Sequence, residues 1–510
     1  MGRTKNSVVN SIWSVLSRMV ALVFPFIART VIIQVLGIEY LGLGSLFNSV
    51  LRILNMAELG VGSAIVFSMY KPVAENDTDL ICALMNLYKR VYRLIGIVVL
   101  LLGVVLLPFL PKLIEGSMPS DINLYLLYII YLSNSVISYW LFAYKSSILN
   151  ACQRNDVVSK VTIVINMLMY STQISLLFVL KNYYFYALAL PIFAIVKNFV
   201  TAHYATKYYP QYYCTGTITV ELKKDIGKRV TGLMMDKVAF ASRNAFDSVI
   251  VSAFLGLQSV AIYNNYYYIS SAVSGLMTAV VVAILPSIGN SIAVETAEKN
   301  EKDMRNLFFI YMCISGACYC LFLNLYQPFM RLWVGDDLRF PTYTMIAFSV
   351  YFLVEKSENI IGNYYDAAGM WWNGRWKGLI EAISNLCLNI ILCKWFGAFG
   401  VVIATLISML FVGIPLTAHF MYKYYYNKKA KSYYIMHYTT VFKLIVIGLI
   451  SFLAGLLIPE GNTSIMLIVC LLVRSVIAVG IFCIFMFLFF SKTDQYKEAK
   501  IWLILHFKRP

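Results

Sequence analysis

Charged residues are scarce in this sequence. Asp, Glu, Lys and Arg make up 13% of the 510 residues, whereas soluble domains carry about 25%. Hydrophobic residues reach 60%, and the mean hydropathy is +0.72. Too few polar side chains remain to cover a surface in water, so the composition excludes a soluble globular protein.

Other absences exclude classes of function. No GxxxxGK[ST] motif occurs, so ATP binding through such a loop is not expected. The ten cysteines are scattered without metal-ligand spacing, and the four histidines lie near predicted helix ends or in loops. The loops predicted outside the membrane are too short for a catalytic domain. We therefore expect no enzyme, no cofactor and no metal site.

Long apolar runs dominate the chain, and strand-length alternation is missing. Ile95–Leu110 is almost continuously apolar, as are Val441–Ile458 and Ile465–Phe490. A helix that crosses a hydrocarbon core of about 30 Å needs about 20 such residues. The sequence therefore predicts an all-α polytopic membrane protein with about 14 transmembrane helices. They are expected at 7–36, 39–70, 88–114, 122–148, 157–180, 183–206, 228–256, 259–289, 304–333, 342–367, 374–396, 398–426, 438–458 and 463–491.

The loops between these helices carry Lys and Arg unequally. About 28 basic residues fall on the side that also holds both termini, against about 5 on the other side. Because cytoplasmic loops are enriched in Lys and Arg, we expect both termini to be cytoplasmic. These short basic loops account for the net charge of +17, so no nucleic-acid partner is expected.

A weak internal repeat divides the chain. The segment VLGIEYLGLGSLFNSV around Gly37 matches FLGLQSVAIYNNYYYI around Gly256, at an offset of 219 residues. Six helices separate the two copies, which therefore have the same orientation, and parallel repeats form two pseudo-symmetric lobes. The predicted parts are an N-lobe of six helices at 1–207, a cytoplasmic connection at 208–227, a C-lobe of six helices at 228–427, two C-terminal helices at 428–491 and a cytoplasmic amphipathic tail at 492–510.

Polar side chains inside the predicted spans are the candidate site. Each charge near the bilayer centre costs about 2.5–3.5 kcal/mol, so such residues are expected to face a wet interior. Arg18 and Arg29 share one face of the first helix, and Arg52 belongs to a polar stripe on the second. None of the three has an acid at i±3 or i±4, which favours contact with an anionic ligand.

The repeat extends this pattern to the helices at 228–256 and 259–289. The stripe residues Ser45, Asn48, Arg52 and Asn55 correspond to Asn264, Tyr267, Ser271 and Ser274, and Arg18 corresponds to Lys237. We infer a positively charged central cavity between the lobes. The expected cationic ligands are Arg18, Arg29, Arg52, Lys237 and Arg243, and the expected polar lining is Asn48, Asn55, Asn264 and Ser271.

Other charged residues in the spans have a structural alternative. Asp236, Arg243 and Asp247 share one helix face and can neutralise one another. The charges of the 342–367 helix can pair among themselves or bind a coupling ion. Arg474 can extend to a membrane surface. The residues left open between an ion-coupling and a structural role are Asp236, Asp247, Glu355, Lys356 and Glu358.

Two segments resemble a known family. They are VIIQVLGIEYLGLGSLFNSVLRILNMAELGVGSAIVFSMYKPVAEND, within the opening Asn6–Lys71 region and just beyond it, and WFGAFGVVIATLIS at Trp395–Ser408. The chain resembles the bacterial oligosaccharide flippases of the Wzx-type polysaccharide transport family. This family lies within the multidrug/oligosaccharidyl-lipid/polysaccharide exporter superfamily. The resemblance extends over essentially the whole length in helix number, topology and repeat.

The resemblance implies a fold of two six-helix lobes around a V-shaped cavity, with two helices appended. It also implies a substrate, an undecaprenyl-pyrophosphate-linked oligosaccharide moved from the inner to the outer leaflet of the bacterial cytoplasmic membrane. In related lipid II flippases, arginines on the first two helices engage the pyrophosphate. That role carries over to Arg18, Arg29 and Arg52, and less directly to Lys237 and Arg243.

Rival functions and partners follow from the same resemblance. An ion-coupled multidrug or small-molecule antiporter of the same fold is the main alternative, although it would favour an acidic cavity. The expected partners are the lipid-linked glycan and membrane lipids, with a polysaccharide polymerase and glycosyltransferases as further candidates. No signal for oligomerisation is visible, and the family is usually monomeric.

Overall fold

The computed structural model describes the backbone of residues 3–58, 60–370, 373–461 and 463–507. Side chains are described at these positions except in the following ranges, which are 3–12, 14–15, 233, 235–242, 244, 279–280, 282–283, 286 and 503–507. The chain divides into two compact units, residues 1–261 and 262–510, which are called unit 1 and unit 2 below.

Every regular element in the described ranges is a helix. Unit 1 contains α1 (Arg3–Val35), α2 (Ile38–Leu54), η1 (Asn55–Glu58), α3 (Val61–Glu75), α4 (Thr78–Leu106), η2 (Leu107–Leu113), α5 (Leu124–Trp140), α6 (Ala143–Ala151), α7 (Asn155–Leu180) and α8 (Tyr183–Tyr208). The long α9 (Val220–Val294) begins in unit 1 and ends in unit 2. Unit 2 continues with α10 (Ala297–Val334), η3 (Asp336–Leu338), α11 (Thr342–Ala367), α12 (Lys377–Ser408), η4 (Met409–Gly413), α13 (Ile414–Tyr424), α14 (Lys431–Gly455), α15 (Ser464–Phe490) and α16 (Asp494–Phe507).

Ten of the described helices are long and apolar enough to cross a membrane, or eleven if the bent pair α5 and α6 forms one span. The all-α membrane fold is confirmed, whereas the count of about 14 is not. Each predicted segment nevertheless falls on a helix. The counts differ because α9 and α12 each run through a break, at Gly256 and Gly397, and because Glu355 and Lys356 lower the hydropathy of α11.

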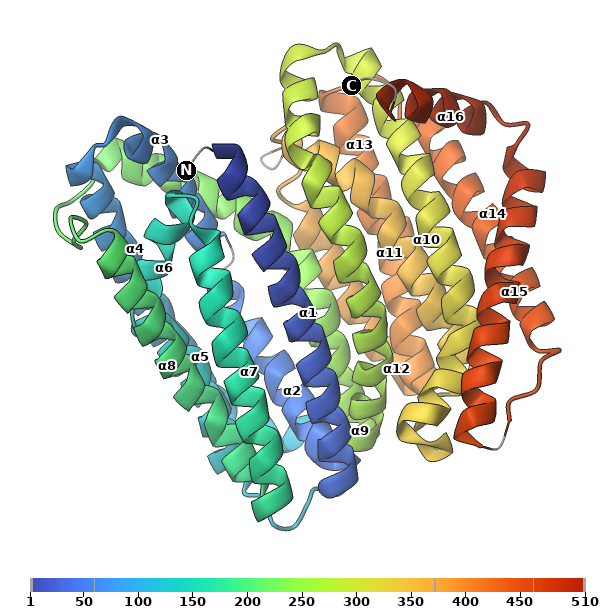
Figure 1. The fold of residues 1–510 in the computed structure, drawn as a ribbon, viewed down its shortest axis with the longest axis horizontal. Helices are drawn as coiled ribbons and strands as arrows, with labels where there is room; N and C mark the ends of the chain where they lie inside the picture. Colours follow the sequence, from blue (N-terminus) through green and yellow to red (C-terminus); the bar gives the residue numbers. More distant parts are fainter. Residues whose placement is uncertain (1–2, 59, 371–372, 462, 508–510) are drawn as a thin grey trace. The chain divides into compact units, whose positions relative to one another are not determined.

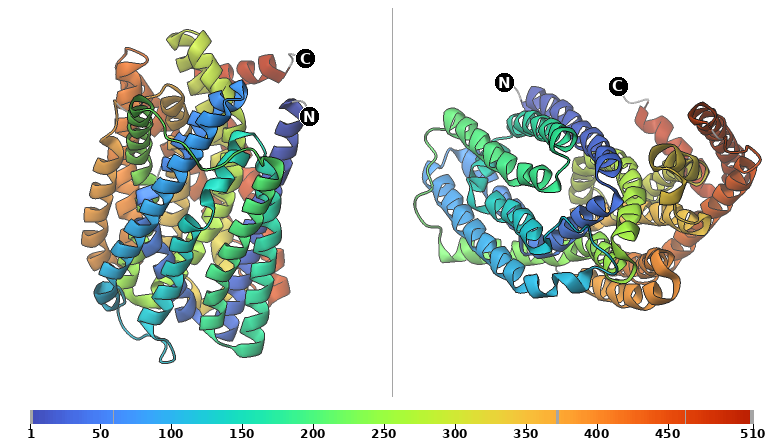
Figure 2. Two further views of the ribbon diagram at one scale, coloured as in Figure 1. Left: turned by 90° about the vertical axis from the view of Figure 1, so that its left-hand side faces the viewer. Right: turned by 90° about the horizontal axis from the view of Figure 1, so that it is seen from below.

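Unit 1 is held together by helices that run alongside one another. α1 packs along α7, α7 along α8, and α8 along α5 (Figures 1 and 2). Phe47 of α2 inserts into this packing, with ring centroids 5.5 Å from those of Tyr128 and Tyr131 on α5. All three side chains are buried, so α2 is anchored in the apolar core of unit 1.

The glycines that begin the predicted repeat share an unusual backbone. Gly37 has φ 120° and ψ 167°, and Gly256 has φ 82° and ψ 179°, a region that only glycine visits without strain. Gly116 and Gly335 are related by the same offset of 219 residues and have φ values of 80° and 88°. A glycine with positive φ thus recurs at the predicted offset in two separate turns, in agreement with the predicted internal repeat. The predicted lobe boundaries at 207 and 228 remain a prediction.

Unit 2 is built around α10. α11, α14, α15 and α16 all pack against it (Figure 1). Asn324 of α10 donates a hydrogen bond to Ser451 of α14 at 3.0 Å, in a fully buried contact. The C-terminal α16 is tied to the start of α10, because Trp502 Nε1 donates to Asp303 Oδ1 at 2.8 Å.

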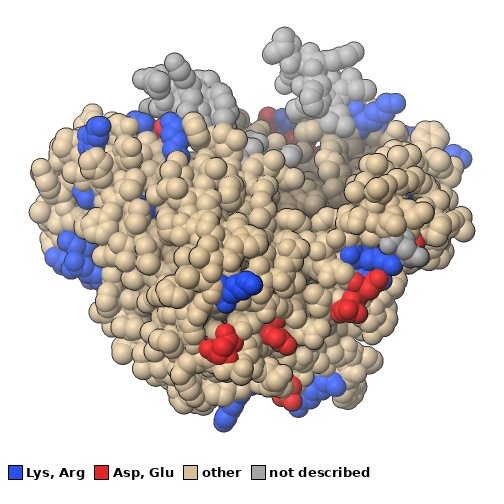
Figure 3. Space-filling view, turned by 60° about the horizontal axis from the view of Figure 1, so that its bottom comes forward, with Lys and Arg blue, Asp and Glu red and all other residues tan. Residues whose placement is uncertain are grey.

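Large apolar side chains are exposed along many helices, as a lipid environment requires. Val179 of α7 is 78% exposed, Trp395 of α12 75% and Val476 of α15 74%, and uncharged residues cover most of the face shown in Figure 3. A protein surrounded by water rarely shows apolar patches of this extent. Together with the ten or eleven candidate spans, these surfaces identify the chain as a multi-pass membrane protein.

Candidate functional site

Three arginines, Arg18, Arg29 and Arg52, are the cations expected at the candidate site, and all three lie on α1 and α2 in unit 1. Arg18 and Arg52 are exposed, and Arg29 is half-buried. The whole of α1 contains no Asp or Glu. Arg52 makes no hydrogen bond or ion pair with any residue that the structure describes. Its guanidinium is therefore available to a ligand.

Arg29 lies beside a group of tyrosines on neighbouring helices. Its charge acts on the hydroxyl groups of Tyr183 and Tyr186 of α8. The Tyr183 hydroxyl lies 3.0 Å from that of Tyr131, and the rings of Tyr183 and Tyr186 stack with centroids 5.4 Å apart. Tyrosine hydroxyl groups therefore provide polar atoms near Arg29 in the interior of unit 1.

The polar stripe of α2 is present but partly used by its own helix. Asn48 is exposed and donates from Nδ2 to the Gly44 carbonyl at 2.8 Å. Asn55 lies where α2 gives way to η1, and its buried Oδ1 accepts no hydrogen bond from the described residues. An unsatisfied buried oxygen costs about 1–3 kcal/mol, so the end of α2 is a site where water or a ligand group would stabilise the protein.

Glu58 is a carboxylate in this region that sequence reasoning left without a role. It ends η1, and the hydroxyl of Tyr92 on α4 donates a short hydrogen bond to it. The ring of Tyr92 stacks on Tyr88 at 4.2 Å and meets Tyr139 edge-on at 5.7 Å. The contact joins residues 34 positions apart, which no local pattern in the sequence reveals.

The candidate residues of α9 are described in part. Arg243 and Asp247 are both buried, one helical turn apart in unit 1. The side chains of Asp236 and Lys237 lie outside the described residues. Ser271 donates to the Tyr268 carbonyl of its own helix at 2.8 Å, and Asn264 is half-buried.

In unit 2 the charges of α11 have partners. Lys356, only 1% exposed, pairs with Glu355 at 3.1 Å, and Ser274 of α9 donates to Glu355 at 3.4 Å. Thr417 of α13 donates to Glu358 at 3.2 Å. These contacts link three helices, which is the arrangement expected of a structural pair and also of a site that exchanges a proton or cation.

A second buried polar group was not anticipated from the sequence. Asn385 donates from Nδ2 to Thr405 Oγ1 at 3.0 Å, and Asn389 donates to Asn385 Oδ1 at 3.1 Å. The Asn385–Thr405 hydrogen bond joins the two arms of α12 on either side of Gly397. The spacing of Asn385 and Asn389 by one helical turn within an apolar run was the available signal.

Comparison with known proteins places the chain in a family. A family model of polysaccharide biosynthesis proteins matches residues 7–292, more than half of the chain. The chain belongs to this family. A comparison with curated protein sequences gives no match.

Solved structures with the same fold include a lipid II flippase and multidrug resistance transporters. A lipid II flippase, MurJ, in an inward closed conformation has a TM-score of 0.67 and 17% identity, covering 95% of this chain and 99% of that chain. An inward-facing multidrug resistance transporter of the MATE family and MOP superfamily has a TM-score of 0.60 and 15% identity, covering 85% and 98%. A MOP superfamily transporter from Pyrococcus furiosus has a TM-score of 0.53 and 15% identity, covering 86% and 96%.

At these identities the likeness shows the fold. The predicted membership of the polysaccharide transport family and its superfamily fold is thereby confirmed. The roles of the arginines, the polar stripe and the charges of α9 and α11 remain predictions.

Proposed function

We propose that the protein is a flippase that moves an undecaprenyl-pyrophosphate-linked oligosaccharide from the inner to the outer leaflet of the bacterial cytoplasmic membrane. It serves surface polysaccharide biosynthesis, and both termini are cytoplasmic. The observation that carries the proposal is the combination of the polysaccharide biosynthesis family match with arginines on α1 and α2.

The arginines suit a diphosphate for a chemical reason. A guanidinium presents planar N–H donors that match phosphate oxygens in pairs, and it stays charged at every physiological pH. Arg52 has no acid to neutralise it among the described residues, and α1 carries no acid at all. In the proposed complex Arg18, Arg29 and Arg52 hold the diphosphate, with Lys237 and Arg243 as further cations.

The proposed mechanism is alternating access. An inward-open state admits the diphosphate and the sugars, while the polyprenyl chain stays in the lipid. The lobes then rock to release the headgroup outside. Pro25 lies inside α1 between Arg18 and Arg29. Because proline lacks the N–H that would close the helical hydrogen bond, α1 can bend there and change the separation of the two arginines.

The alternative is an ion-coupled antiporter for drugs or other small molecules. Because the fold is shared with a multidrug resistance transporter, the experiment below also tests this alternative. The Pyrococcus furiosus structure is described as having a binding pocket of reverse polarity that suggests a different function. The sign of the cavity charge is therefore the property on which the two functions divide, and the arginines of α1 and α2 favour an anionic substrate.

The test is translocation in liposomes that contain a labelled polyprenyl-diphosphate oligosaccharide. We expect wild type to move the lipid to the opposite leaflet, and Arg18→Gln, Arg29→Gln and Arg52→Gln each to slow it at least tenfold. The factor follows because a hydrogen bond to a charged group contributes about 1.5–3 kcal/mol. Arg90→Gln, which removes an exposed arginine of α4, is the matched control.

The outcomes separate the functions. If folded arginine variants translocate at the wild-type rate, the site assignment is wrong. If wild type moves no lipid-linked sugar but exports organic cations, the antiporter replaces the flippase.

A further inference from the structure

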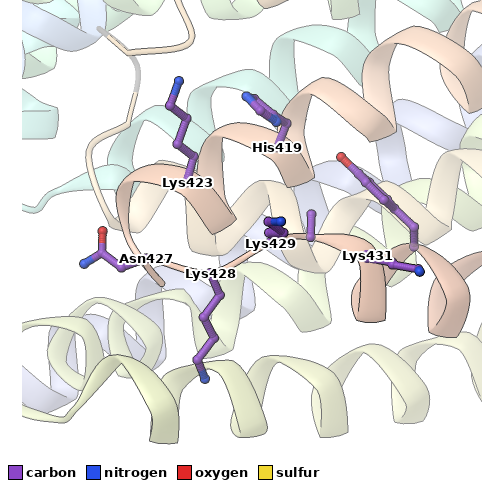
Figure 4. A pocket seen from close by; sticks show the side chains of 8 residues that line it. His419, Lys423, Asn427, Lys428, Lys429 and Lys431 are labelled. Carbon is purple, nitrogen blue, oxygen red and sulfur yellow. The ribbon is translucent and has the colours of Figure 1, made fainter.

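A cationic hollow lies in unit 2 where α13 ends and α14 begins. It has a volume of about 590 Å³, and its lining includes His419, Lys423, Lys428, Lys429 and Lys431 (Figure 4). No Asp or Glu belongs to the lining. These five side chains and the space between them are called the lysine hollow.

The turn between α13 and α14 is built to a fixed shape. Asn427 has φ 52°, a left-handed conformation that Asn tolerates, and the Lys428 amide returns to the Tyr422 carbonyl at 3.0 Å. Tyr434 in the first turn of α14 donates to the Pro415 carbonyl of α13 at 2.9 Å. The two helices that border the lysine hollow are therefore tied together at both sides of the turn.

One of the four lysines belongs to the supporting structure. Figure 4 shows Lys428 pointing to the opposite side of the turn from Lys423. Its Nζ lies 2.9 Å from Glu301 of α10, and this hydrogen bond raises the pKa of Lys428. Arg305 of α10 donates to Ser432 at 2.7 Å, so α10 also holds the start of α14.

The other lysines are not neutralised in this way. Lys429 and Lys431 are exposed and make no hydrogen bond or ion pair within the described part of the chain. Lys423 lies over the ring of Tyr424, 5.2 Å from its centroid, and projects to the same side of α13 as His419 (Figure 4). The positive charge of the lysine hollow is therefore open to an external anion.

The start of α14 adds to the positive potential. Its N-cap is Ala430, which has no side-chain acceptor, and its first turn has no acid but contains Lys431. A helix N-terminus carries about half a positive charge, so a lysine there is repelled and an anion is attracted. An anion bound in the lysine hollow would relieve both effects.

An apolar stripe continues from the lysine hollow along α14. It begins one helical turn after Lys431, and its members recur every seven residues and so share one helix face. They are Ile435 (60% exposed), Phe442 (66%), Leu449 (38%) and Leu456 (53%). A ligand that has an anionic head and a long apolar chain matches the lysine hollow followed by the apolar stripe.

We propose that the lysine hollow binds the phosphate headgroup of an anionic bilayer phospholipid whose acyl chain lies along the apolar stripe of α14. The loop from 425 to 430 is on the side that the distribution of Lys and Arg predicts to be cytoplasmic, where anionic headgroups attract lysines. The site uses residues of unit 2 alone and needs nothing of the proposed transport activity.

The test is lipid binding by the full-length protein in neutral detergent. Short-chain phosphatidylglycerol is titrated against phosphatidylcholine, and affinity is read from the rise of the unfolding midpoint. We expect saturable stabilisation by phosphatidylglycerol and little by phosphatidylcholine. Lys429→Gln/Lys431→Gln should bind phosphatidylglycerol about 25-fold more weakly, since each lysine near an anionic headgroup contributes about fivefold. Lys223→Gln/Lys224→Gln removes two exposed lysines elsewhere and should bind as wild type does.

Two further arms identify the source of the phosphate. Ile435→Ser/Phe442→Ser should weaken binding of phosphatidylglycerol but leave binding of inorganic phosphate unchanged, because the charge of the lysine hollow is retained. Equal binding by wild type and Lys429→Gln/Lys431→Gln overturns the proposal. The proposal is also overturned if undecaprenyl diphosphate displaces phosphatidylglycerol at a concentration well below that of phosphatidylglycerol. That result would assign the lysine hollow to the transported lipid.

Discussion

Removing the charge of Glu460 should destabilise unit 2, because this one carboxylate forms ion pairs with three arginines. Its oxygens lie 3.1 Å from Arg339, 3.5 Å from Arg474 and 3.8 Å from Arg331. In Glu460→Gln, Arg331 and Arg339 keep their ion pairs with Asp336. Among the described residues, Arg474 then keeps only the Ile458 carbonyl at 2.6 Å, although its side chain is 5% exposed.

The magnitude follows from the burial of Arg474. Removing one partner of a fully buried ion pair costs about 3–5 kcal/mol. The Glu460 side chain is 22% exposed and the glutamine oxygen can still accept a hydrogen bond, so we expect a loss of about 2 kcal/mol. Thermal unfolding of purified protein should show a midpoint about 4 °C lower if unit 2 unfolds by itself, and about 2 °C lower if the whole chain unfolds as one unit.

The control and a second variant test the cause. Asp337→Asn removes a neighbouring exposed acid that forms no ion pair with the described residues, and its midpoint should match wild type. Glu460→Gln/Arg474→Met should recover part of the loss, because it also removes the buried charge. A wild-type midpoint for Glu460→Gln, or a double variant less stable than the single one, would refute the reasoning.

Two further results are expected. Gly400→Ala should lower stability by about 1–3 kcal/mol in the same unfolding assay, because its new Cβ would lie 2.0 Å from the Leu392 carbonyl oxygen. Gly227→Ala, which meets nothing within 4 Å, is the control, and equal midpoints would contradict the close packing of the α12 arms. Cys214 lies in the 209–219 connection, and burial raises the pKa of its thiol. At pH 8 a smaller fraction of this thiol is therefore in the reactive thiolate form than in an exposed cysteine. Peptide mass spectrometry should show slower alkylation by iodoacetamide than in the denatured chain, with a rate that still rises at higher pH; equal rates at pH 8 would contradict this.

Properties that depend on neighbouring residues in the chain could be predicted from sequence. Apolar runs located the helices, and the match between Gly37 and Gly256 anticipated two turns of the same backbone conformation. α11 was found as a helix in spite of Glu355 and Lys356, because its flanking residues keep a helical apolar pattern.

Contacts between distant residues could not be predicted in the same way. The sequence allows Arg474 to extend to a membrane surface, but its side chain is buried and contacts Glu460 and the Ile458 carbonyl. Whether the Arg474 guanidinium contacts water or a carboxylate depends on how the loop before α15 folds. Likewise, the pairing of Tyr92 with Glu58 depends on the packing of α4 against the end of α2, which periodicity does not specify.

Whether a Lys or Arg side chain has an acidic partner helps to distinguish a structural role from a ligand-binding role. In unit 2, Arg305 pairs with Glu301, Lys356 with Glu355 and Arg474 with Glu460. A buried cation that loses its acid is left with an uncompensated charge, so we expect removal of the acid from such a pair to destabilise unit 2. Arg52 in unit 1 is exposed and has no such acid among the described residues.

A difference between the two classes of variant follows from this contrast. Substitution of a paired cation changes stability whether or not a substrate is present. We expect substitution of Arg52 to leave the unfolding midpoint of the free protein unchanged and to act on the proposed transport alone. If Arg52→Gln lowered the midpoint as much as Glu460→Gln does, Arg52 would be a structural residue, and the cationic site would rest on Arg18 and Arg29.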